Sequence, residues 1–520
     1  MAQTSPDPGQ PDDQRDVIAF LEHGAFGRET PDRIDTHCAS VFLVGDSAWK
    51  LKRAIRFDYL DFSTAERRHA ALEEELRLNR RTAPGLYRAV HAIARSANGG
   101  LSIDGNGPAV DWLLEMRRFP DDALFDDRAK NGQLDPSMLM RLSERIVQFH
   151  AGADAIRVDN GAERFRDVVL GNIASMEAFP QILDPERIGC LAERLADMTA
   201  AAAGLLDRRG RSGRVRHGHG DLHLANIALV DGEPTLFDCL EFSAELATVD
   251  VLYDLAFLLM DLWHRDLRAA ANIVFNRYLD LSPADEEGLA LMPLFLSVRA
   301  AIRSHVMAAQ AFRDEGNSSL AEAARAYFDL AFALIRPVPP RLVAIGGLSG
   351  TGKSTVARMI GGDIGRAPGA RIFRSDVVRK RVAGLPPEAR LPQDAYSPQS
   401  SDAVYGAVDE LAAGALLTGQ AVIVDAVFAG TDQRGRTEAV AARAGSPFDG
   451  FWLEADAGIR LARVGGRRLD ASDADIAVAR AQADMAIGDL GSWHRIAADG
   501  PVAATAREVM KCLRLKGDRP

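Results

Sequence analysis

The chain has 520 residues, of which 47% are hydrophobic and 26% are charged, and its formal net charge is −11. Because domains usually contain about 100 to 200 residues, we expect two or three domains. The composition is that of a soluble globular protein, and no apolar run approaches the roughly 18 residues that span a bilayer, so we expect no membrane partner and a cytoplasmic location. The acidic excess lies in residues 1–340, which disfavours bulk nucleic-acid binding there, whereas residues 341–520 are slightly basic.

The chain begins with a polar, acidic segment that contains proline, which excludes a secretory signal and predicts a disordered tail over residues 1–19. Residues 36–60 predict a β-hairpin, because an apolar run, a Gly45-Asp46 turn and an alternating segment follow one another. The pattern then predicts a helix, a strand, a helical stretch, a strand-rich interruption and a second helical stretch: 63–81, 110–119, 135–205, 214–240 and 250–335. We therefore expect a small β-rich lobe followed by a large helical lobe.

The densest polar constellation covers residues 216–226. Asp221 and Asn226 are separated by four residues, as in the D-x-x-x-x-N catalytic loop of kinases, and Asp238 follows the apolar strand expected at 234–237. In this interpretation Asp221 accepts the proton of the acceptor hydroxyl, while Asn226 and Asp238 hold the Mg²⁺ that bridges the ATP phosphates.

The same segment allows a second interpretation, as the site of a zinc-dependent hydrolase. His217, His219, Asp221 and His223 resemble the H-x-H-x-D-H motif of metallo-β-lactamases with one inserted residue. The kinase interpretation accounts for three residues at once, so we prefer it and keep the zinc site as an alternative.

A kinase also needs a lysine that holds the nucleotide phosphates, paired with a carboxylate on the next helix. Lys50 lies on the second strand of the expected hairpin with the alternation of a V-A-I-K motif, so we choose it over Lys52. Its partner should be Glu73, Glu74 or Glu75. On a helical wheel Glu74 lies opposite the leucine stripe, which leaves the other two, and Glu75 is our choice.

Residues 20–335 resemble the aminoglycoside phosphotransferase family, whose fold is protein-kinase-like. The resemblance rests on the loop from Asp221 to Asn226, on Asp238 and on the helix expected at 249–256. It implies an α+β domain with two lobes and an adenine-binding hinge at 116–120. The sequence lacks the glycine-rich phosphate loop G-x-G-x-x-G, which this family also often lacks.

A proline-rich linker at 336–341 contains three prolines in four residues, which prevents a helix from continuing and begins a new domain at 342–520. A short apolar strand at 342–345 leads into residues 347–354, which match the P-loop motif G-x-x-x-x-G-K-[ST], and a helix is expected next. Nucleotide contacts are expected from the P-loop and the residue after it: Gly347, Ser349, Gly350, Thr351, Gly352, Lys353, Ser354 and Thr355. Lys353 would reach the β and γ phosphates, and the Ser354 hydroxyl would bind Mg²⁺.

Further charged residues indicate that this nucleotide site catalyses phosphoryl transfer. Asp376 follows a second expected strand and is the candidate base, with Arg379 as the substrate anchor. Asp425 ends a third expected strand, where a carboxylate would organise Mg²⁺. Arg463 and Arg467 stand four residues apart on one helical face and would form an arginine-bearing lid.

Residues 341–500 resemble the small P-loop kinases that include polynucleotide 5′-kinases, zeta toxins and chloramphenicol phosphotransferase. The spacings of Asp376 to Arg379 and of Arg463 to Arg467 are most similar to polynucleotide kinase. This resemblance implies an α/β P-loop NTPase domain with a parallel sheet. The order of the two domains resembles bacterial bifunctional phosphotransferase/ATP-binding proteins.

The resulting hypothesis is an ATP-dependent phosphotransferase with two separate Mg-ATP sites that act on hydroxyl acceptors. The acceptor would be a small molecule in the front domain, and a small molecule or a polynucleotide 5′-hydroxyl end in the rear domain. An alternative makes one domain an ATP-binding regulatory or toxin-like module. Nothing in the sequence indicates an obligate protein partner, and the acceptors themselves do not follow from it.

Overall fold

The computed structural model describes residues 12–36, 38–57, 60–314, 317–466, 472–473, 476–482 and 485–517. The chain divides into two compact units: Met1–Arg157 with Gly213–Asp254, and Val158–Ser212 with Leu255–Pro520. The second unit therefore joins helices that precede the proline-rich segment to the P-loop region that follows it.

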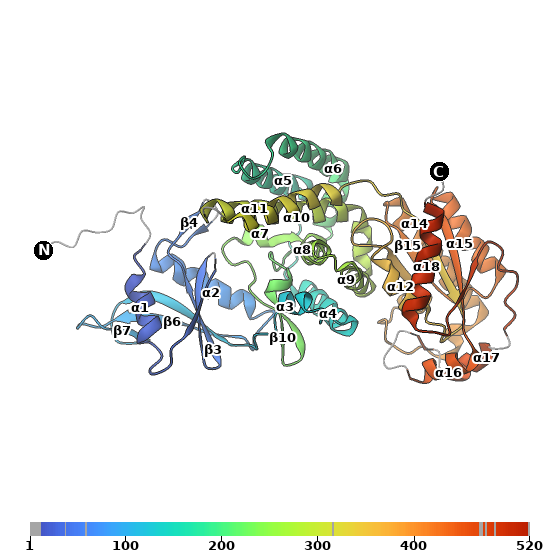
Figure 1. Cartoon of the computed structure of the whole chain (residues 1–520), viewed down its shortest axis with the longest axis horizontal. Helices are drawn as coiled ribbons and strands as arrows, with labels where there is room; N and C mark the ends of the chain where they lie inside the picture. Colours follow the sequence, from blue (N-terminus) through green and yellow to red (C-terminus); the bar gives the residue numbers. More distant parts are fainter. Residues whose placement is uncertain are drawn as a thin grey trace. The chain divides into compact units, whose positions relative to one another are not determined.

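The first unit is built around a six-stranded sheet with the order β1-β2-β3-β8-β6-β7 (Figure 1). Its strands are Asp32–Asp35 (β1), Ala39–Val44 (β2), Ser47–Lys52 (β3), Tyr87–Arg95 (β6), Leu101–Ile103 (β7) and Ala109–Arg117 (β8). The expected hairpin is confirmed, since β2 and β3 pair antiparallel from Ala39 with Lys52 to Val44 with Ser47. The β-rich lobe predicted from the sequence is thus present.

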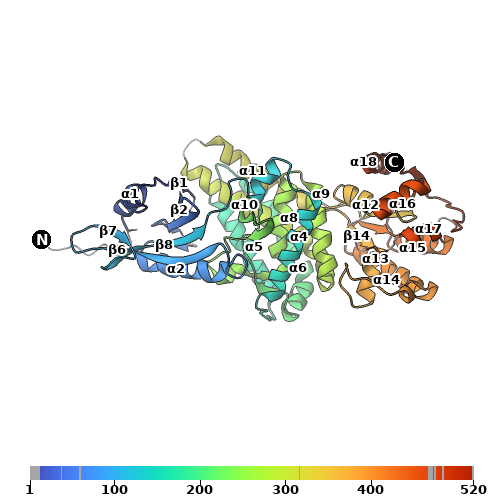
Figure 2. The ribbon, with the colours of Figure 1, turned by 90° about the horizontal axis from the view of Figure 1, so that it is seen from below.

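One helix packs on each face of this sheet. Adjacent residues of a strand point to opposite faces, so Leu113 packs with α1 (Arg15–His23) and Leu114 packs with α2 (Ala65–Asn79). Figure 2 shows α2 lying along β8. This packing fixes α2, which carries Glu75, against the strands that carry the candidate lysine.

The remaining elements of the first unit include those beside the segment that carries Asp221 and Asn226. They are β4 (Arg56–Phe57), β5 (Leu60–Asp61), α3 (Phe125–Lys130), α4 (Pro136–Gly152), β9 (Val215–His217), η1 (Leu224–Asn226), β10 (Ile227–Val230), β11 (Glu233–Leu236), α7 (Ala244–Ala247), β12 (Thr248–Asp250) and the first turn of α8 (Val251–His264). β10 and β11 pair antiparallel, as do β9 and β12. The 3₁₀ turn η1 begins three residues after the candidate base Asp221.

Helix α4 begins where the sequence supplies a cap. The Asp135 carboxylate accepts the backbone N–H groups of Ser137 and Met138, and Pro136 takes the first helical position. Such a cap contributes about 1 kcal/mol, and proline at this position has no N–H to leave unsatisfied.

The helices of the second unit are α5 (Gly161–Glu177), α6 (Pro185–Arg211), the rest of α8, α9 (Arg268–Leu281), η2 (Pro283–Leu291), α10 (Met292–Arg313) and α11 (Ser318–Leu334). Pro283–Arg313 is the one segment among the described residues that is long and apolar enough to span a membrane, a property we did not expect from the sequence. Of its most apolar window 72% is buried inside the structure, and α10 packs against α11 and α5. This degree of burial is typical of a core helix.

A five-stranded parallel sheet with the order β14-β15-β13-β16-β17 forms the rest of the second unit. Its strands are Leu342–Gly347 (β13), Arg371–Arg374 (β14), Val422–Asp425 (β15), Phe448–Glu454 (β16) and His494–Ala497 (β17). The accompanying helices are α12 (Lys353–Gly361), α13 (Ser375–Val382), η3 (Gln393–Tyr396), α14 (Pro398–Leu417), α15 (Thr431–Arg443), α16 (Ala457–Gly465), α17 (Ile476–Ala481) and α18 (Val502–Gly517). The expected α/β P-loop fold with a parallel sheet is confirmed.

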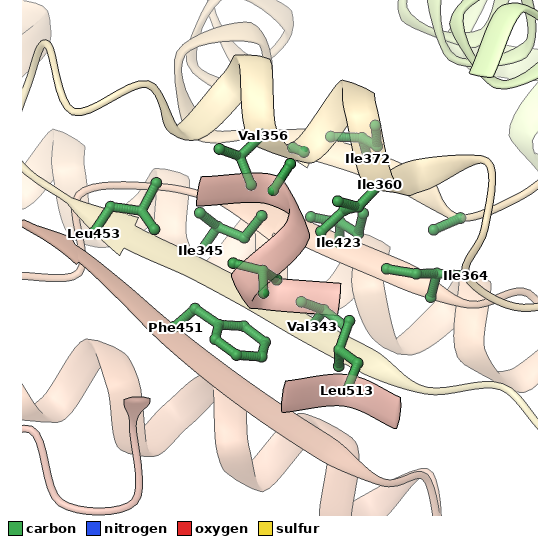
Figure 3. Close-up of a cluster of buried hydrophobic side chains, with 14 of the residues drawn as sticks. Val343, Ile345, Val356, Ile360, Ile364, Ile372, Ile423, Phe451, Leu453 and Leu513 are labelled. Atoms are coloured by element: carbon green, nitrogen blue, oxygen red, sulfur yellow. The ribbon is translucent and has the colours of Figure 1, made fainter. Parts of the chain in front are cut away.

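The central strand β13 is buried along its whole length. Val343 and Ile345 point to one face, where they pack against Val356 of α12 and Leu513 of α18 (Figure 3). Strands buried on both faces are typical of parallel sheets. The core therefore fixes the end of β13, where the P-loop begins.

Candidate active sites

The first candidate site contains a buried network of charged groups. Lys50 Nζ on β3 lies 2.6 Å from Glu75 Oε1 on α2 and 2.6 Å from Asp238 Oδ1. Glu75 has no exposed side-chain surface. Burial alone would lower the pKa of Lys50, but Asp238 and Glu75 raise that pKa well above its ordinary value. Lys50 is therefore held as a cation at the point where nucleotide phosphates would bind.

Lys52 belongs to the same network, although the sequence favours Lys50 over Lys52 as the lysine that holds the nucleotide phosphates. Residues two apart on a strand point to the same face, and Lys52 Nζ lies 2.6 Å from Glu75 Oε2 and also contacts Glu241. Both lysines therefore share Glu75, and the strand period could have indicated this. Glu241 carried no such signal, because its place beside Lys52 depends on how the chain folds around Asp238.

Asp238 takes an unusual backbone conformation that aims its carboxylate at Lys50. Its φ of 61° lies in the left-handed region, which few residues except Gly, Asn and Asp adopt. Its backbone N–H donates to the Tyr87 hydroxyl at 3.0 Å. Burial would raise the pKa of Asp238, but Lys50 and Lys52 lower it below its ordinary value, so the carboxylate is anionic and suited to Mg²⁺.

The catalytic loop holds Asp221 and Asn226 together. Asn226 Nδ2 donates to Asp221 Oδ2 and to the Asp221 backbone oxygen, each at 2.9 Å. Asp254 anchors the loop. Its fully buried carboxylate accepts hydrogen bonds from the backbone N–H groups of His219 at 2.8 Å and Gly220 at 2.9 Å. We had not assigned a role to Asp254, whose position here follows from the start of α8.

Two histidines of this loop make contacts with neighbouring protein groups. His219 is buried with its Nε2 3.0 Å from the Phe237 backbone oxygen, and His223 Nε2 lies 3.3 Å from Asp221. Among the residues that the structure describes, no group of three or more His, Cys, Asp or Glu is placed to hold a metal ion. The zinc alternative gains no support from this arrangement.

A cavity of about 470 Å³ also opens in the first unit. Arg81, Phe149 and Asp231 are among its lining residues, and none of the candidate catalytic or Mg²⁺-binding residues lines it. The ion network and the cavity are thus separate features of this unit.

The second candidate site is the loop between β13 and α12. Gly347, Gly350 and Gly352 have φ values of 142°, 90° and 94°. A Cβ at Gly350 would lie 2.5 Å from the backbone oxygen of Arg460, so no larger residue fits there without a shift. The loop ends at Lys353, the first residue of α12, and the helix dipole favours phosphate at this end of the helix. These residues fit the triphosphate of a nucleotide.

The Mg²⁺ candidates of this site lie in contact. Ser354 Oγ donates to Asp425 Oδ2 at 2.5 Å, and Arg374 Nε lies 3.5 Å from the same oxygen. Lys353 Nζ donates to the Leu348 backbone oxygen at 3.1 Å. A hydroxyl and a carboxylate at the mouth of the loop are the oxygen ligands that Mg²⁺ prefers.

A further contact of the loop was not predicted from the sequence. The backbone N–H of Ser349 donates to Gln482 Oε1 at 2.7 Å. Gln482 lies more than 120 residues from the loop in sequence, so no local pattern could have indicated it. An amide oxygen here binds one of the N–H groups that would otherwise face phosphate.

Asp376 lies in the first turn of α13, directly after β14. In the parallel pair of β14 and β15, Arg374 stands opposite Asp425. Asp425 ends β15 and Asp376 comes two residues after the end of β14, so both lie at the same edge of the sheet. Arg379 is buried and donates to the Ala395 backbone oxygen at 2.7 Å. Asp376 therefore lies at the edge of the sheet where Asp425 lies. Arg379 holds the segment near residue 395 through its hydrogen bond to Ala395.

Of the two arginines of the expected lid, the structure describes Arg463. Arg463 Nη1 donates to the Ala498 backbone oxygen at 2.7 Å, and its Nη2 donates to the Gly500 backbone oxygen at 2.9 Å. Arg467 lies outside the described residues. Arg460 is 5% exposed, and its backbone lies against Gly350, so it is the arginine of α16 nearest the P-loop backbone.

Comparison with known proteins finds a family model that is similar to the rear part of the chain. Residues 342–486 match the family model described as an AAA domain. The chain is 29% identical over 481 residues to the uncharacterized protein Rv2004c of Mycobacterium tuberculosis, which covers 90% of this chain and 92% of that protein. The uncharacterized protein Mb2027c of Mycobacterium bovis matches to the same extent. The similarity therefore extends over most of the chain.

Solved structures are similar to one part of the chain each. A choline/ethanolamine kinase family protein of Mesorhizobium loti is 15% identical and covers 62% of this chain and 94% of its own, with a TM-score of 0.38. A gluconokinase of Sinorhizobium meliloti is 18% identical and covers 35% of this chain and 99% of its own, with a TM-score of 0.24. An APS kinase of Mycobacterium tuberculosis is 21% identical and covers 34% of this chain and 99% of its own, with a TM-score of 0.26.

Proposed function

We propose that the chain is an ATP-dependent phosphotransferase with two separate Mg-ATP sites. The observation that carries the proposal is the P-loop geometry, in which Ser354 contacts Asp425 at the mouth of a glycine loop that leads into α12. An anion-binding loop with Mg²⁺ ligands beside it is what transfer of a γ-phosphoryl group requires. Asp376, at the same edge of the sheet, would accept the proton of the acceptor hydroxyl.

The first unit supplies the second site. Lys50 would hold the α and β phosphates, and Glu75 keeps this lysine in place. Asn226 and Asp238 would bind Mg²⁺, which neutralises charge on the phosphates when it is bound. Asp221 would then accept the proton of a hydroxyl acceptor, with its carboxylate oriented by Asn226 at 2.9 Å.

The Lys50 contact with Asp238 indicates how the site would respond to nucleotide. A bound phosphate would compete with Asp238 for an N–H donor of the Lys50 ammonium group. We expect nucleotide to take the place of Asp238 at Lys50, which frees the Asp238 carboxylate for Mg²⁺. Lys52 keeps Glu75 anchored on its other oxygen during this exchange.

For the acceptors we propose a small-molecule hydroxyl at the first site, and a small molecule or a nucleic-acid 5′-hydroxyl at the P-loop site. The slight positive excess of residues 341–520 is compatible with a phosphorylated or polynucleotide acceptor. We propose the cytoplasm, where ATP is abundant, as the location.

Transfer of label from γ-labelled ATP to a panel of sugars, aminoglycosides, nucleosides and 5′-hydroxyl oligonucleotides tests the proposal. Asp221→Ala should abolish transfer to one class of acceptor, and Lys353→Ala should abolish transfer to another. Asp231→Ala and Lys511→Ala are matched controls, because both side chains are largely exposed. Transfer that survives in both single variants and in their combination would disprove the proposal.

A further inference from the structure

The helices before the proline-rich segment meet the P-loop region through a buried polar contact inside the second unit. Arg371, the first residue of β14, is 2% exposed. Its guanidinium lies 2.7 Å from Asp280 and 2.8 Å from Glu286, and it donates to Asn276 at 3.0 Å. Burial would lower the pKa of Arg371, but Asp280 and Glu286 raise it. Arg371 is therefore a buried cation that is held by Asp280 of α9 and Glu286 of η2.

The backbones at this contact approach so closely that side chains are excluded. A Cβ at Gly361 would collide with Asn272 of α9, and one at Gly362 would lie 2.6 Å from the Arg268 backbone. Asn272 Nδ2 donates to the Ala370 backbone oxygen at 2.8 Å. The C-terminal end of α12 and the start of β14 thus pack directly against α9, and this close packing indicates a specific interface.

Glu286 connects the same contact to α13. Besides Arg371 it pairs with Arg381 of α13 at 3.0 Å. Arg277 of α9 pairs at 2.6 Å with Glu388, which follows α13 in the chain. Helix α13 carries Asp376 in its first turn, so the strand before it, its last turn and the segment after it are all held by residues of α9 and η2.

We propose that Glu286 is a positioning residue that sets α13 in place, so that the acceptor side of the P-loop site depends on the helices before the proline-rich segment. This inference rests on the proposed function, in which Asp376 serves the acceptor. Loss of the Glu286 charge leaves the buried Arg371 with Asp280 as its carboxylate partner, and it frees Arg381 from its tie to η2. The P-loop itself, between β13 and α12, keeps its own contacts.

Hydrogen exchange of the full-length protein tests the positioning role without requiring a known acceptor. In Glu286→Gln, which keeps the shape of the side chain, the α13 amides should exchange roughly tenfold faster or more, and those of α15 should change less than about twofold. Arg381→Gln removes only the tie to α13 and should give the same local effect in a milder form. Asp329→Asn, which removes an exposed pair with Arg187 elsewhere in the helical part, is the matched control.

Unchanged exchange of α13 in both variants would overturn the inference, and so would an equal rise in α13 and α15, because that would indicate general destabilisation. The effect of Glu286 on catalysis is measured in a protein that also carries Asp221→Ala, so that the P-loop site is the source of transfer. Adding Glu286→Gln should raise the KM of the acceptor or lower kcat at least about fivefold, with the KM of ATP within about twofold. Absence of all transfer would disprove the proposed function, while the exchange result would still decide the positioning role.

Discussion

Replacing Glu75 by glutamine tests the buried ion network of the first unit. The carboxylate has no exposed surface and contacts Lys50 and Lys52, each at 2.6 Å. Removing one member of a buried ion pair usually costs about 3 to 5 kcal/mol. Here each lysine keeps another carboxylate, Asp238 or Glu241, so we expect a loss near the lower limit, about 3 kcal/mol in the free energy of unfolding.

The assay is hydrogen exchange of the β3 amides as a function of urea concentration, which reports the opening of the first unit. A loss of about 3 kcal/mol corresponds to exchange through unfolding that is faster by roughly 150-fold. Glu73→Gln is the matched control, because Glu73 lies two residues away on the same helix with 54% of its side chain exposed and an ion pair to His69 at 3.5 Å. If Glu75→Gln stays within about 0.5 kcal/mol of this control, the network does not hold α2 against the sheet.

Two other predictions concern the second unit. Gly350→Ala places a Cβ 2.5 Å from the Arg460 backbone oxygen. Nucleotide affinity at the P-loop should therefore fall at least roughly tenfold in a filter-binding assay, while Asp221-dependent transfer persists. Unchanged affinity would contradict the fit of the loop. Burial lowers the pKa of His305 to about 4. Because this folded pKa is lower than that of the unfolded chain, the stability from neutral His305 is complete above about pH 6.5 and falls by up to about 1.4 kcal/mol per pH unit toward pH 4. His305→Gln should flatten this part of the stability profile in chemical denaturation, and an unchanged slope would refute the assignment.

Local sequence patterns were sufficient for the parts of the sites that lie within one short segment. The P-loop at 347–354 is read from consecutive residues, and its strand and helix are present as expected. The hairpin that carries Lys50 followed from alternation, since a period of two assigns residues to faces of a sheet.

Contacts between distant segments could not be predicted in the same way. Glu241 reaches Lys52 across 189 residues, and Arg371 reaches Glu286 across 85. Such pairs depend on how helices and strands pack, which propensity and periodicity do not encode. The proline-rich segment predicted where a new domain begins, and it gave no indication that Arg371 of β14 contacts residues of α9 and η2.

The stoichiometry of nucleotide binding tests the central claim most directly. Calorimetric titration with a non-hydrolysable ATP analogue and Mg²⁺ should show two bound nucleotides per chain. Lys50→Ala and Lys353→Ala should each lose a different one, and the double variant should bind none. A single nucleotide per chain in the unaltered protein, or two that survive in either variant, would contradict the account.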